Sequence, residues 1–441
     1  MSKSSKIRVL SVCTSDVSGG AARAAYRIHQ GVQSLGVDSR MLVKYKGSND
    51  PTVHALEEFI PHNALYDALD WCAAKVKNKI QHYQWNRYPN QDSSFKSDMR
   101  STRIFGALHA FDYDVLHLHW INQRFLPLDE LAKIHKPIVW TLHDSWPFCG
   151  TCHYFLDCEN YQRQCGNCPQ LASNNSNDLS HQIWQRKYDI YKTLDLHIVS
   201  PSHWLAECAR RSSLFLDRDI HVIPNGLDTN VFRPLSDEEI QSIADNEKNE
   251  VVKQILSKSI QNRQNEKPML LYGAVNATKD KIKGFSNLLL ALQKLDEQRL
   301  AVHLVVFGAD TQNLPINFKY IDVSFVGHIS NSALLVGLYN AADVMVVPSY
   351  TEVFGQTASE AMACGTPVVA FRCTGIQDVV GAESGFLATP YSTDDLAYGI
   401  QWCLLNNRDN VLGKNARDKV LNNYTSKIIS EKYKELYLSL I

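Results

Sequence analysis

Short apolar runs, separated by longer amphipathic stretches, recur along the whole chain. Most of these runs are continuously apolar, which is typical of parallel strands covered on both faces. In the first half they are Ile7–Thr14, Val115–Trp120, Pro137–Asp144, Leu196–Ser202 and His221–Pro224. In the second half they are Met269–Val275, His303–Gly308, Val323–Val326, Val344–Pro348 and Pro367–Phe371. The alternation of strands with helical patterns predicts an α/β fold with two doubly wound, Rossmann-like domains.

Turn-rich and charged segments divide this pattern into domains. We expect an N-terminal domain over residues 1–228, with a Cys-rich loop at 149–168, and a C-terminal domain over 268–414. Residues 229–267 are charged and rich in Gln and Asn, and we expect them to form a linker or a variable helical segment. Residues 415–441 are expected to form a C-terminal helix, and its return to the N-terminal domain is left open.

Length and composition change this picture only modestly. A chain of 441 residues is too long for one typical core, which agrees with two domains. The net charge of −1 disfavours nucleic acid as a partner, because such proteins usually carry a basic footprint. The N-terminus shows no signal-peptide pattern and no apolar stretch reaches the ~18 residues of a spanning helix, so we expect a cytoplasmic protein. Its cysteines would then be reduced thiols or metal ligands.

Candidate site residues follow the predicted strands, because ligands bind doubly wound sheets at the carboxyl ends of their strands. Gly19 and Gly20 open a helix whose backbone amides could bind an anion, although a simple glycine turn is the alternative. His143 follows another strand and is either structural or catalytic. A basic turn after a third strand could neutralise phosphates or be merely solvated, and it contains Lys279, Lys281 and Lys283.

The stretch "PSYTEVFGQTASEAMACGTPVVAF" places Glu352 on a loop and Glu360 in the first turns of the next helix. The backbone amides of the residues between them, Phe354, Gly355, Gln356 and Thr357, suit a phosphate at a helix N-terminus. A carboxylate on each side could accept hydrogen bonds from vicinal hydroxyls, as a ribose or a sugar offers. The spacing therefore predicts a diphosphate site with a diol on each side, and a charged helix start with a surface turn is the alternative.

Several motifs occur together in a recognisable order: "SGGAARAA", "HDSWPF", "VIPNGLDTNVFRP", a Lys-Gly before a helix, "FVGHIS", the stretch containing the two glutamates, and "GIQDVV". In this order the chain resembles the retaining glycosyltransferases of family 4, which have the GT-B fold, two Rossmann-like domains facing across a cleft. The Trp- and Cys-rich "TLHDSWPFCGTCHY…CENYQRQCGNCPQL" is similar to the branch that builds bacterial exopolysaccharide, colanic-acid-type and O-antigen chains.

The resemblance implies a role for each candidate. Glu360 would hold the nucleotide ribose, Glu352 the hydroxyls of the donor sugar, and Lys283 the diphosphate. Gly20 would approach the diphosphate from the N-terminal domain, and His143 would lie beside the donor sugar. The backbone of Gly327 and His328 would contact the base. The family usually has an arginine where this chain has Ala277, and Lys279 or Lys281 is expected to replace its charge.

The reaction that the resemblance implies is sugar transfer from a nucleotide-diphosphate sugar, a UDP-sugar first and a GDP-sugar next, to a saccharide or lipid-linked acceptor in bacterial polysaccharide synthesis. A nucleotide-sugar 2-epimerase and a sugar-nucleotide-binding scaffold without activity are the alternatives. No catalytic metal is expected. Two Asp-x-Asp triplets, at 112–114 and 217–219, precede their strands and are interpreted as solvated strand starts.

Two further patterns have open interpretations. Four cysteines of the Cys-rich loop would suit a structural zinc ion, with reduced buried thiols as the alternative, namely Cys152, Cys158, Cys165 and Cys168. An apolar stripe at helical spacing with neighbouring lysines indicates either packing or peripheral contact with the inner face of the cell membrane. The stripe consists of Leu65, Leu69, Cys72, Val76 and Ile80.

Overall fold

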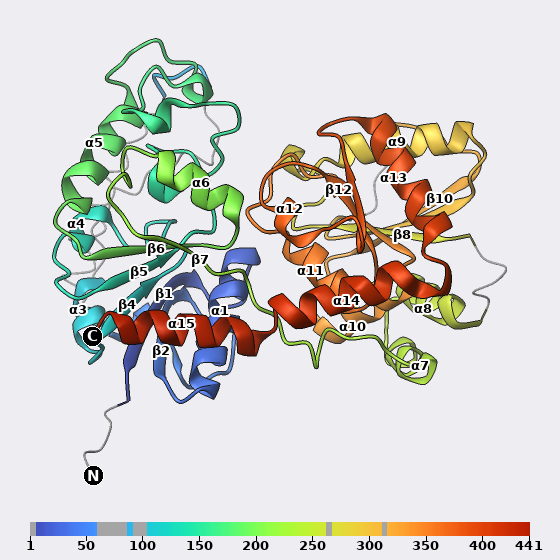
Figure 1. Ribbon diagram of the computed structural model, residues 1–441, viewed down its shortest axis with the longest axis horizontal. Helices are drawn as coiled ribbons and strands as arrows, with labels where there is room; N and C mark the ends of the chain where they lie inside the picture. The colour runs from blue at the N-terminus through green and yellow to red at the C-terminus, as the bar shows by residue number, and fades with distance from the viewer. Residues whose placement is uncertain (1–5, 60–85, 91–103, 262–266, 311–314) are drawn as a thin grey trace. The chain divides into compact units, whose positions relative to one another are not determined.

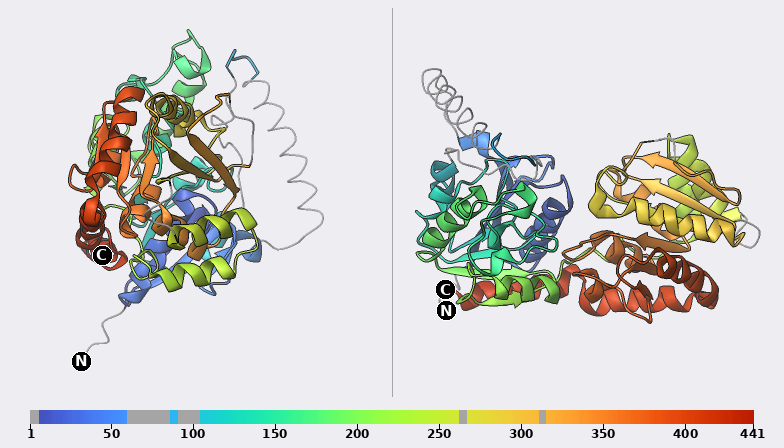
Figure 2. Two further views of the ribbon diagram at one scale, coloured as in Figure 1. Left: turned by 90° about the vertical axis from the view of Figure 1, so that its right-hand side faces the viewer. Right: turned by 90° about the horizontal axis from the view of Figure 1, so that it is seen from above.

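The structure is a computed structural model that describes residues 6–59, 86–90, 104–261, 267–310 and 315–441. These residues form two compact units, one made of Met1–Pro224 with Ile429–Ile441 and the other of Asn225–Ile428. Each unit contains one parallel sheet with helices on both of its sides (Figures 1 and 2). The prediction of two doubly wound α/β domains is confirmed.

The sheet of the first unit has the order β3-β2-β1-β4-β5-β6-β7, so the strand order reverses between β1 and β4. The strands are β1 (Arg8–Ser15), β2 (Asp38–Tyr45), β3 (Val53–Ala55), β4 (Val115–Leu118), β5 (Ile138–Thr141), β6 (Leu196–Ser200) and β7 (Ile220–Val222). The helices are α1 (Gly20–Ser34), α3 (Ile104–His109), α4 (Leu128–Leu131), α5 (Leu179–Tyr191), α6 (His203–Arg211) and, from the end of the chain, α15 (Ser426–Ser439).

The sheet of the second unit has the order β10-β9-β8-β11-β12-β13 and reverses between β8 and β11. The strands are β8 (Met269–Gly273), β9 (Val302–Phe307), β10 (Ile321–Gly327), β11 (Val344–Val347), β12 (Val368–Phe371) and β13 (Gly385–Ala388). The helices are α7 (Asp237–Asp245), α8 (Glu250–Gln261), α9 (Phe285–Glu297), α10 (Ser332–Ala341), α11 (Gln356–Ala363), α12 (Ile376–Val379), α13 (Thr393–Asn406) and α14 (Val411–Asn423).

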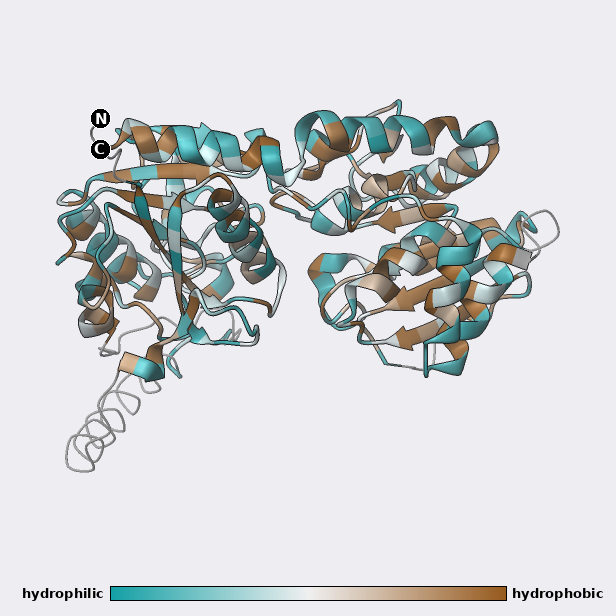
Figure 3. Ribbon diagram, turned by 90° about the horizontal axis from the view of Figure 1, so that it is seen from below, coloured by the Kyte–Doolittle hydropathy of each residue, from teal (hydrophilic) through white to brown (hydrophobic). Residues whose placement is uncertain are grey.

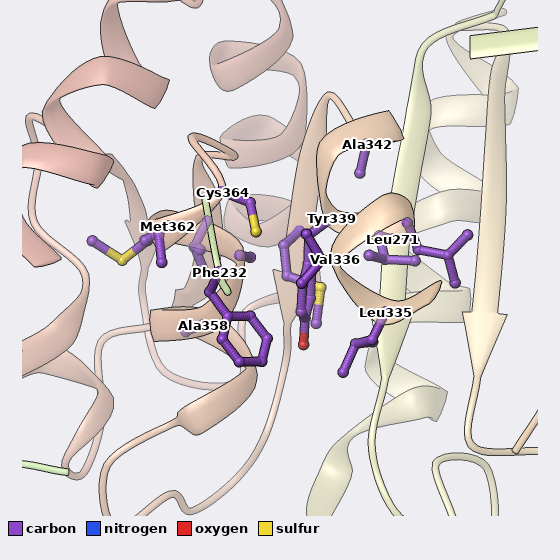
Figure 4. Packing of buried hydrophobic residues seen from close by; sticks show 14 of the residues in the cluster. Phe232, Leu271, Leu335, Val336, Tyr339, Ala342, Ala358, Met362 and Cys364 are labelled. Carbon is purple, nitrogen blue, oxygen red and sulfur yellow. The ribbon is translucent and has the colours of Figure 1, made fainter. Parts of the chain in front are cut away.

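The strands of the second unit are apolar throughout because both faces of the sheet are buried. Met269 and Leu271 of β8 belong to the cluster formed with α8, α10 and α11, and Leu270 and Tyr272 belong to the cluster formed with α9 and α13. Figure 4 shows Leu271 in the first of these clusters, which also contains Tyr339 of α10. A fully buried leucine contributes about 1.5–3 kcal/mol.

Helix α15 belongs to the first unit through an apolar stripe at helical spacing. Ile429, Tyr433 and Tyr437 are buried in one cluster with residues of β1, β4, β5 and β6. The hydropathy colouring shows apolar and polar residues along the helix that ends at the C-terminus (Figure 3). The expected single helix over 415–441 is two helices, α14 and α15. The helix is interrupted between them, where Leu227 N–H donates to the Tyr424 carbonyl and Ser426 N–H donates to the Leu227 carbonyl.

Residues 229–261, within the segment expected to be a linker or a variable helical segment, belong to the second unit and contain helices α7 and α8. Helix α7 begins with a capping box in which Ser236 and Glu239 exchange hydrogen bonds. Ile240 of α7 and Leu256 of α8 are fully buried in the core of this unit. Composition alone left a linker and a helical segment both open, because it does not show which faces of these two helices are buried.

The predicted strands all coincide with observed ones, but β2, β3 and β13 were not predicted. β3 and β13 are edge strands of three and four residues. β2 carries charged residues among its apolar ones. Among the described residues, no helix combines the length and the apolar composition needed to cross a membrane. The apolar stripe from Leu65 to Ile80 lies outside the described residues.

Candidate functional site

An ion pair joins the two loops that flank the strand-order reversal of the second sheet, where ligands bind this class of sheet. Lys283 lies in the loop after β8 and Glu352 in the loop after β11, and Lys283 Nζ is 2.8 Å from Glu352 Oε1. Ser349 Oγ donates to the same carboxylate oxygen at 2.9 Å. The side chains of Lys283 and Glu352 are 19% and 17% exposed, so their charges attract each other more strongly than they would in bulk water.

The backbone of Glu352 is fastened to the loop that follows β12. Glu352 N–H donates to Thr374 Oγ1 at 3.0 Å, and Gly375 N–H donates to the Glu352 carbonyl at 2.8 Å. Thr374 has a φ of 55°, a conformation that β-branched residues rarely adopt. We did not single out Thr374 from the sequence, although it lies just after a predicted strand, which was the signal available.

The glycine that follows Lys283 permits the ion pair. Gly284 has a φ of 71°, and a Cβ on it would lie 1.9 Å from the carbonyl oxygen of Pro348 at the end of β11. Only glycine allows this close backbone approach. The Lys-Gly pair therefore brings the β8 loop against the β11 loop, and this contact carries Lys283 to Glu352.

Helix α11 begins at the Glu352 loop. Its N-cap is Gly355, with a φ of 93° and no side-chain cap hydrogen bond. The first amides of a helix have no intrahelical hydrogen-bond acceptor. Phe354 is buried and packs edge-on against Tyr424, which holds the start of the helix. Gln356 and Thr357 are half-buried.

Glu360 lies inside α11 and is only 2% exposed. Tyr339 O–H donates to its Oε2 at 3.1 Å (Figure 4 shows Tyr339 among its apolar neighbours). A buried carboxylate needs such hydrogen-bond donors. Tyr339 was not among the candidates, because its apolar surroundings in α10 make it read as a core residue.

The position of the family's usual arginine points into the core. Ala277 is fully buried in the cluster with Phe285, and its carbonyl accepts a hydrogen bond from Tyr272 O–H at 2.6 Å. Lys279 and Lys281 of the same loop are exposed. A charge on this loop therefore comes from the lysines and not from position 277.

The turn after β10 contains the predicted base-binding pair. Gly327 has a φ of 73°, and a Cβ on it would meet no atom within 4 Å. Its carbonyl accepts from Gly308 N–H at 2.7 Å, and His328 is exposed. The backbone of this turn is thus open on one side.

In the first unit, the predicted glycine turn lies at the strand-order reversal. α1 begins at Gly20, and Gly19 before it has a φ of 91°. A Cβ on either glycine would meet no atom within 4 Å. Asp16, in the same loop between β1 and α1, accepts hydrogen bonds from the backbone N–H groups of Gly47 and Ser48 at 2.8 and 2.9 Å, which joins this loop to the segment after β2.

His143 lies two residues beyond β5 and is partly buried. Its Nε2 is 3.1 Å from His119 Nδ1. Burial lowers the pKa of His143 to about 4, although the nearby Asp144 carboxylate opposes this shift. Asp144 itself accepts from Trp120 Nε1–H at 2.8 Å and contacts His153 Nδ1 at 2.6 Å, so it acts as a buried anchor.

The structure brings Lys283 and Glu352 into direct contact and keeps Gly19, Gly20 and His143 in the other unit. The triplet at 112–114 forms ion pairs with Arg8 at the start of β1. A strand-start role accounts for that triplet.

The four candidate zinc-binding cysteines of the Cys-rich loop differ in burial. Cys152 and Cys168 are buried, whereas Cys158 and Cys165 are partly exposed. Burial raises the pKa of the Cys165 thiol to about 12. Within the described ranges, no three His, Cys, Asp or Glu side chains are arranged to hold a metal ion. The zinc site stays a prediction, and metal analysis of the purified protein would decide it.

A buried lysine supports this loop from α5. Lys187 Nζ donates to the carbonyls of Cys149 and Gly150 at 2.9 and 3.0 Å, and also to that of Trp146. It lies 3.6 Å from the centre of the Trp146 ring. Burial lowers the pKa of Lys187 to about 7. Sequence reasoning missed this residue because lysines in helices usually face solvent.

Two family models match the chain, one in each half. The model described as Glycosyltransferase Family 4 matches residues 18–231, and the model described as Glycosyl transferases group 1 matches residues 253–419. The second match contains Lys283, Glu352 and Glu360, and the first contains Gly19, Gly20 and His143.

Curated relatives are similar over part of their length. The chain is 28% identical over 223 residues to the putative colanic acid biosynthesis glycosyl transferase WcaC of Escherichia coli (strain K12), covering 48% of this chain and 52% of the relative. It is 29% identical over 167 residues to the capsular polysaccharide biosynthesis glycosyltransferase CapM of Staphylococcus aureus, covering 36% of this chain and 43% of the relative. The chain thus aligns with about half of the length of these relatives.

A solved structure is similar over nearly the whole chain. Anabaena HepE, in complex with UDP and glucose, matches with a TM-score of 0.63 at 18% identity, covering 98% of this chain and 100% of that one. This likeness shows the GT-B fold.

Proposed function

The chain belongs to the family 4 glycosyltransferases and has the GT-B fold, and on this premise we propose that it is a retaining glycosyltransferase. It would move a sugar from a nucleotide-diphosphate sugar to a saccharide or lipid-linked saccharide in bacterial polysaccharide biosynthesis. The colanic acid and capsular relatives support this process, and the UDP held by HepE favours a UDP-sugar over a GDP-sugar. The observation that carries the proposal is the Lys283–Glu352 ion pair beside the start of α11.

The donor would be held through groups that the second unit already positions. The Lys283 ammonium and the first-turn amides of α11 would bind the diphosphate, whose negative charge grows as it leaves. Glu360 would accept hydrogen bonds from the ribose hydroxyls, and Glu352 from the hydroxyls of the donor sugar. The cation and the helix N-terminus supply the neutralisation that a divalent metal would otherwise provide.

In the reaction, the acceptor hydroxyl oxygen forms a bond to C1 of the sugar on the face from which the phosphate departs. The C1–O bond to the phosphate breaks, the acceptor proton passes to the departing phosphate oxygen, and the nucleoside diphosphate leaves. Glu352 is held by Lys283 and Ser349, which suits hydroxyl binding better than attack on C1. The protein would contribute positioning and charge stabilisation.

A thermal-shift panel with UDP, GDP, ADP and CMP, each repeated as sugar conjugates, tests the donor. Ligand at ~100 times its dissociation constant adds ~2.7 kcal/mol of stability. We expect a shift with one base. It should fall to about half or less in Lys283→Met, in which tenfold weaker binding leaves ~1.4 kcal/mol. It should be unchanged in the control Lys258→Met, which changes an exposed lysine of α8. The responding conjugate then enters a transfer assay in which proton NMR reads the anomeric configuration of the product.

Inversion of configuration would refute retention, and the absence of any nucleotide response would refute the donor class. The scaffold alternative is kept open by Ala277, which cannot present the usual arginine charge. If the purified protein binds the nucleotide but neither transfers the sugar nor slowly hydrolyses the sugar donor, that result would favour the scaffold alternative.

A further inference from the structure

Three histidines lie in a row where β4 and β5 end. His117 belongs to β4 and His119 follows it, so both side chains lie on one face of the sheet. The ring centres of His117 and His119 are 4.0 Å apart, and those of His119 and His143 are 5.3 Å apart. The contact between His119 Nδ1 and His143 Nε2 at 3.1 Å joins this row to a predicted catalytic residue that is expected to lie beside the donor sugar.

That contact is a hydrogen bond with one proton, and two arrangements can supply it. Either His119 Nδ1–H donates to His143 Nε2, or His143 Nε2–H donates to His119 Nδ1. A neutral imidazole carries a single proton, so the second arrangement moves the proton of His119 to its Nε2. His119 is 2% exposed and its Nε2 has no hydrogen-bond partner.

The two arrangements therefore differ in what they leave unpaired in the interior. The second buries an N–H donor without an acceptor, which is rare in proteins and costly. The first leaves only an acceptor lone pair unfilled. The first arrangement also fixes the tautomer of His143, because a neutral ring that accepts at Nε2 must carry its own proton on Nδ1.

We propose that His119 is a positioning residue that holds His143 as the neutral tautomer protonated at Nδ1. The His143 Nδ1–H group would then donate a hydrogen bond to the sugar of the nucleotide sugar. Among the described residues, no hydrogen bond engages His143 Nδ1, and this side chain is only partly buried. The tautomer follows from the geometry of the first unit alone. The role toward a sugar rests on the proposed function.

The surroundings keep the row neutral and fixed. Burial lowers the pKa of His117 to about 3 and also lowers the pKa of His119. His117 is held at both nitrogens, by Tyr437 O–H at 2.7 Å and by Thr141 Oγ1 at 2.8 Å. Since Tyr437 belongs to α15, the C-terminal helix fixes the His117 ring, which packs against His119.

The tautomer can be read without any substrate. Two-bond proton–nitrogen correlations of the full chain labelled with ¹⁵N-histidine, at neutral pH, distinguish rings protonated at Nδ1 from rings protonated at Nε2. The His143 signals are assigned by their disappearance in His143→Asn. We expect His143 to be protonated at Nδ1. Protonation at Nε2 in the wild-type protein would overturn the proposal.

Amide isosteres test the role in transfer. His119→Asn places an N–H close to the position of the lost Nδ1–H, whereas His119→Gln places it near Nε2 and His119→Leu offers none. We expect kcat/KM to fall about tenfold in the Leu and Gln variants and to recover most of that loss in the Asn variant. For the same reason, His143→Asn should retain more activity than His143→Gln.

A buried histidine elsewhere in the unit serves as the matched control. His29 is fully buried and bonded to Ser39 and Thr52, so His29→Leu should lower Tm without changing the tautomer of His143. Equal losses in the three His119 variants, or better activity for Gln than for Asn, would refute the positioning role. An Nδ1-protonated His143 in a protein that transfers no sugar would support the tautomer and refute the proposed function.

Discussion

Neutralising Glu352 should separate nucleotide binding from sugar binding. Glu352→Gln keeps the size of the side chain and an oxygen that can accept from Ser349, but removes the charge that pairs with Lys283 at 2.8 Å. At an effective dielectric of about 20 the gross attraction at this distance is about 6 kcal/mol. Desolvation of two side chains less than one-fifth exposed offsets most of it. The net loss of stability should be about 1.5–3 kcal/mol, the usual value of a charged hydrogen bond.

This loss should appear as a melting shift of the second unit. For a unit of this size, 1 kcal/mol corresponds to about 2–4 °C. Lys283→Met should cost at least as much, because it leaves the Glu352 carboxylate partly buried without its cation.

Binding should respond in opposite ways to these two changes. In the unliganded protein the Lys283 ammonium is engaged by Glu352, and a diphosphate must compete for it. Glu352→Gln removes this competition, so UDP affinity should stay equal or rise by up to about tenfold. The same variant should lose the extra affinity that the sugar of a UDP-sugar contributes. Lys283→Met should weaken both ligands by about tenfold or more.

Isothermal titration calorimetry of the wild type, both variants and the double variant measures these affinities at fixed ionic strength. Lys258→Met again serves as the surface control. If Glu352→Gln weakens UDP as strongly as Lys283→Met does, the competition does not exist and Glu352 does not act as a sugar-binding group.

Three further changes test other parts of the molecule. Gly284→Ala should destabilise the protein by more than about 3 kcal/mol, because the new Cβ would meet a backbone carbonyl. Gly327 has a similar φ but open space around it, so Gly327→Ala should cost only about 1 kcal/mol. Equal melting shifts for the two variants would contradict this difference. Glu360→Ala should weaken UDP and UDP-sugar alike by about 1–3 kcal/mol, whereas Tyr339→Phe should cost about 1 kcal/mol; unchanged nucleotide affinity would exclude a ribose role. Burial lowers the pKa of His29 from 6.5 to about 4, so the unfolded chain binds a proton first and stability should fall as pH drops from about 6.5 to about 4. That loss is at most about 3 kcal/mol, and urea titrations in which His29→Leu keeps the same pH slope would refute it.

Strand prediction succeeded where burial on both faces imposes a continuous apolar run. The segment Val344–Pro348 could be read directly from the sequence, and it became β11. Prediction missed the three-residue edge strand Val53–Ala55, and also β2, which carries charged residues among its apolar ones. For residues 229–261 composition indicated a linker or a helical segment and did not show which faces of the helices are buried.

The candidate site was predictable as a set of residues and not as an arrangement. Lys283 and Glu352 follow strands, and the rule that ligands bind at strand ends was sufficient to select them. Their contact was not foreseen, since they are 69 residues apart and meet only because Gly284 packs on the β11 loop. Thr374 and Tyr339 were missed for the same reason, because a hydroxyl gains its role from the partner that folding places beside it.

The sequence by itself determined the two α/β units, the family and the positions where a charged or flexible residue follows a strand. These properties depend on local apolar patterns and on short motifs, whose information lies within a few neighbouring residues. The tertiary structure decided which side chains meet, such as His119 with His143 in one unit and Tyr339 with Glu360 in the other. Protonation states and ion pairs depend on burial and on partners distant in the chain, so only packing could establish them.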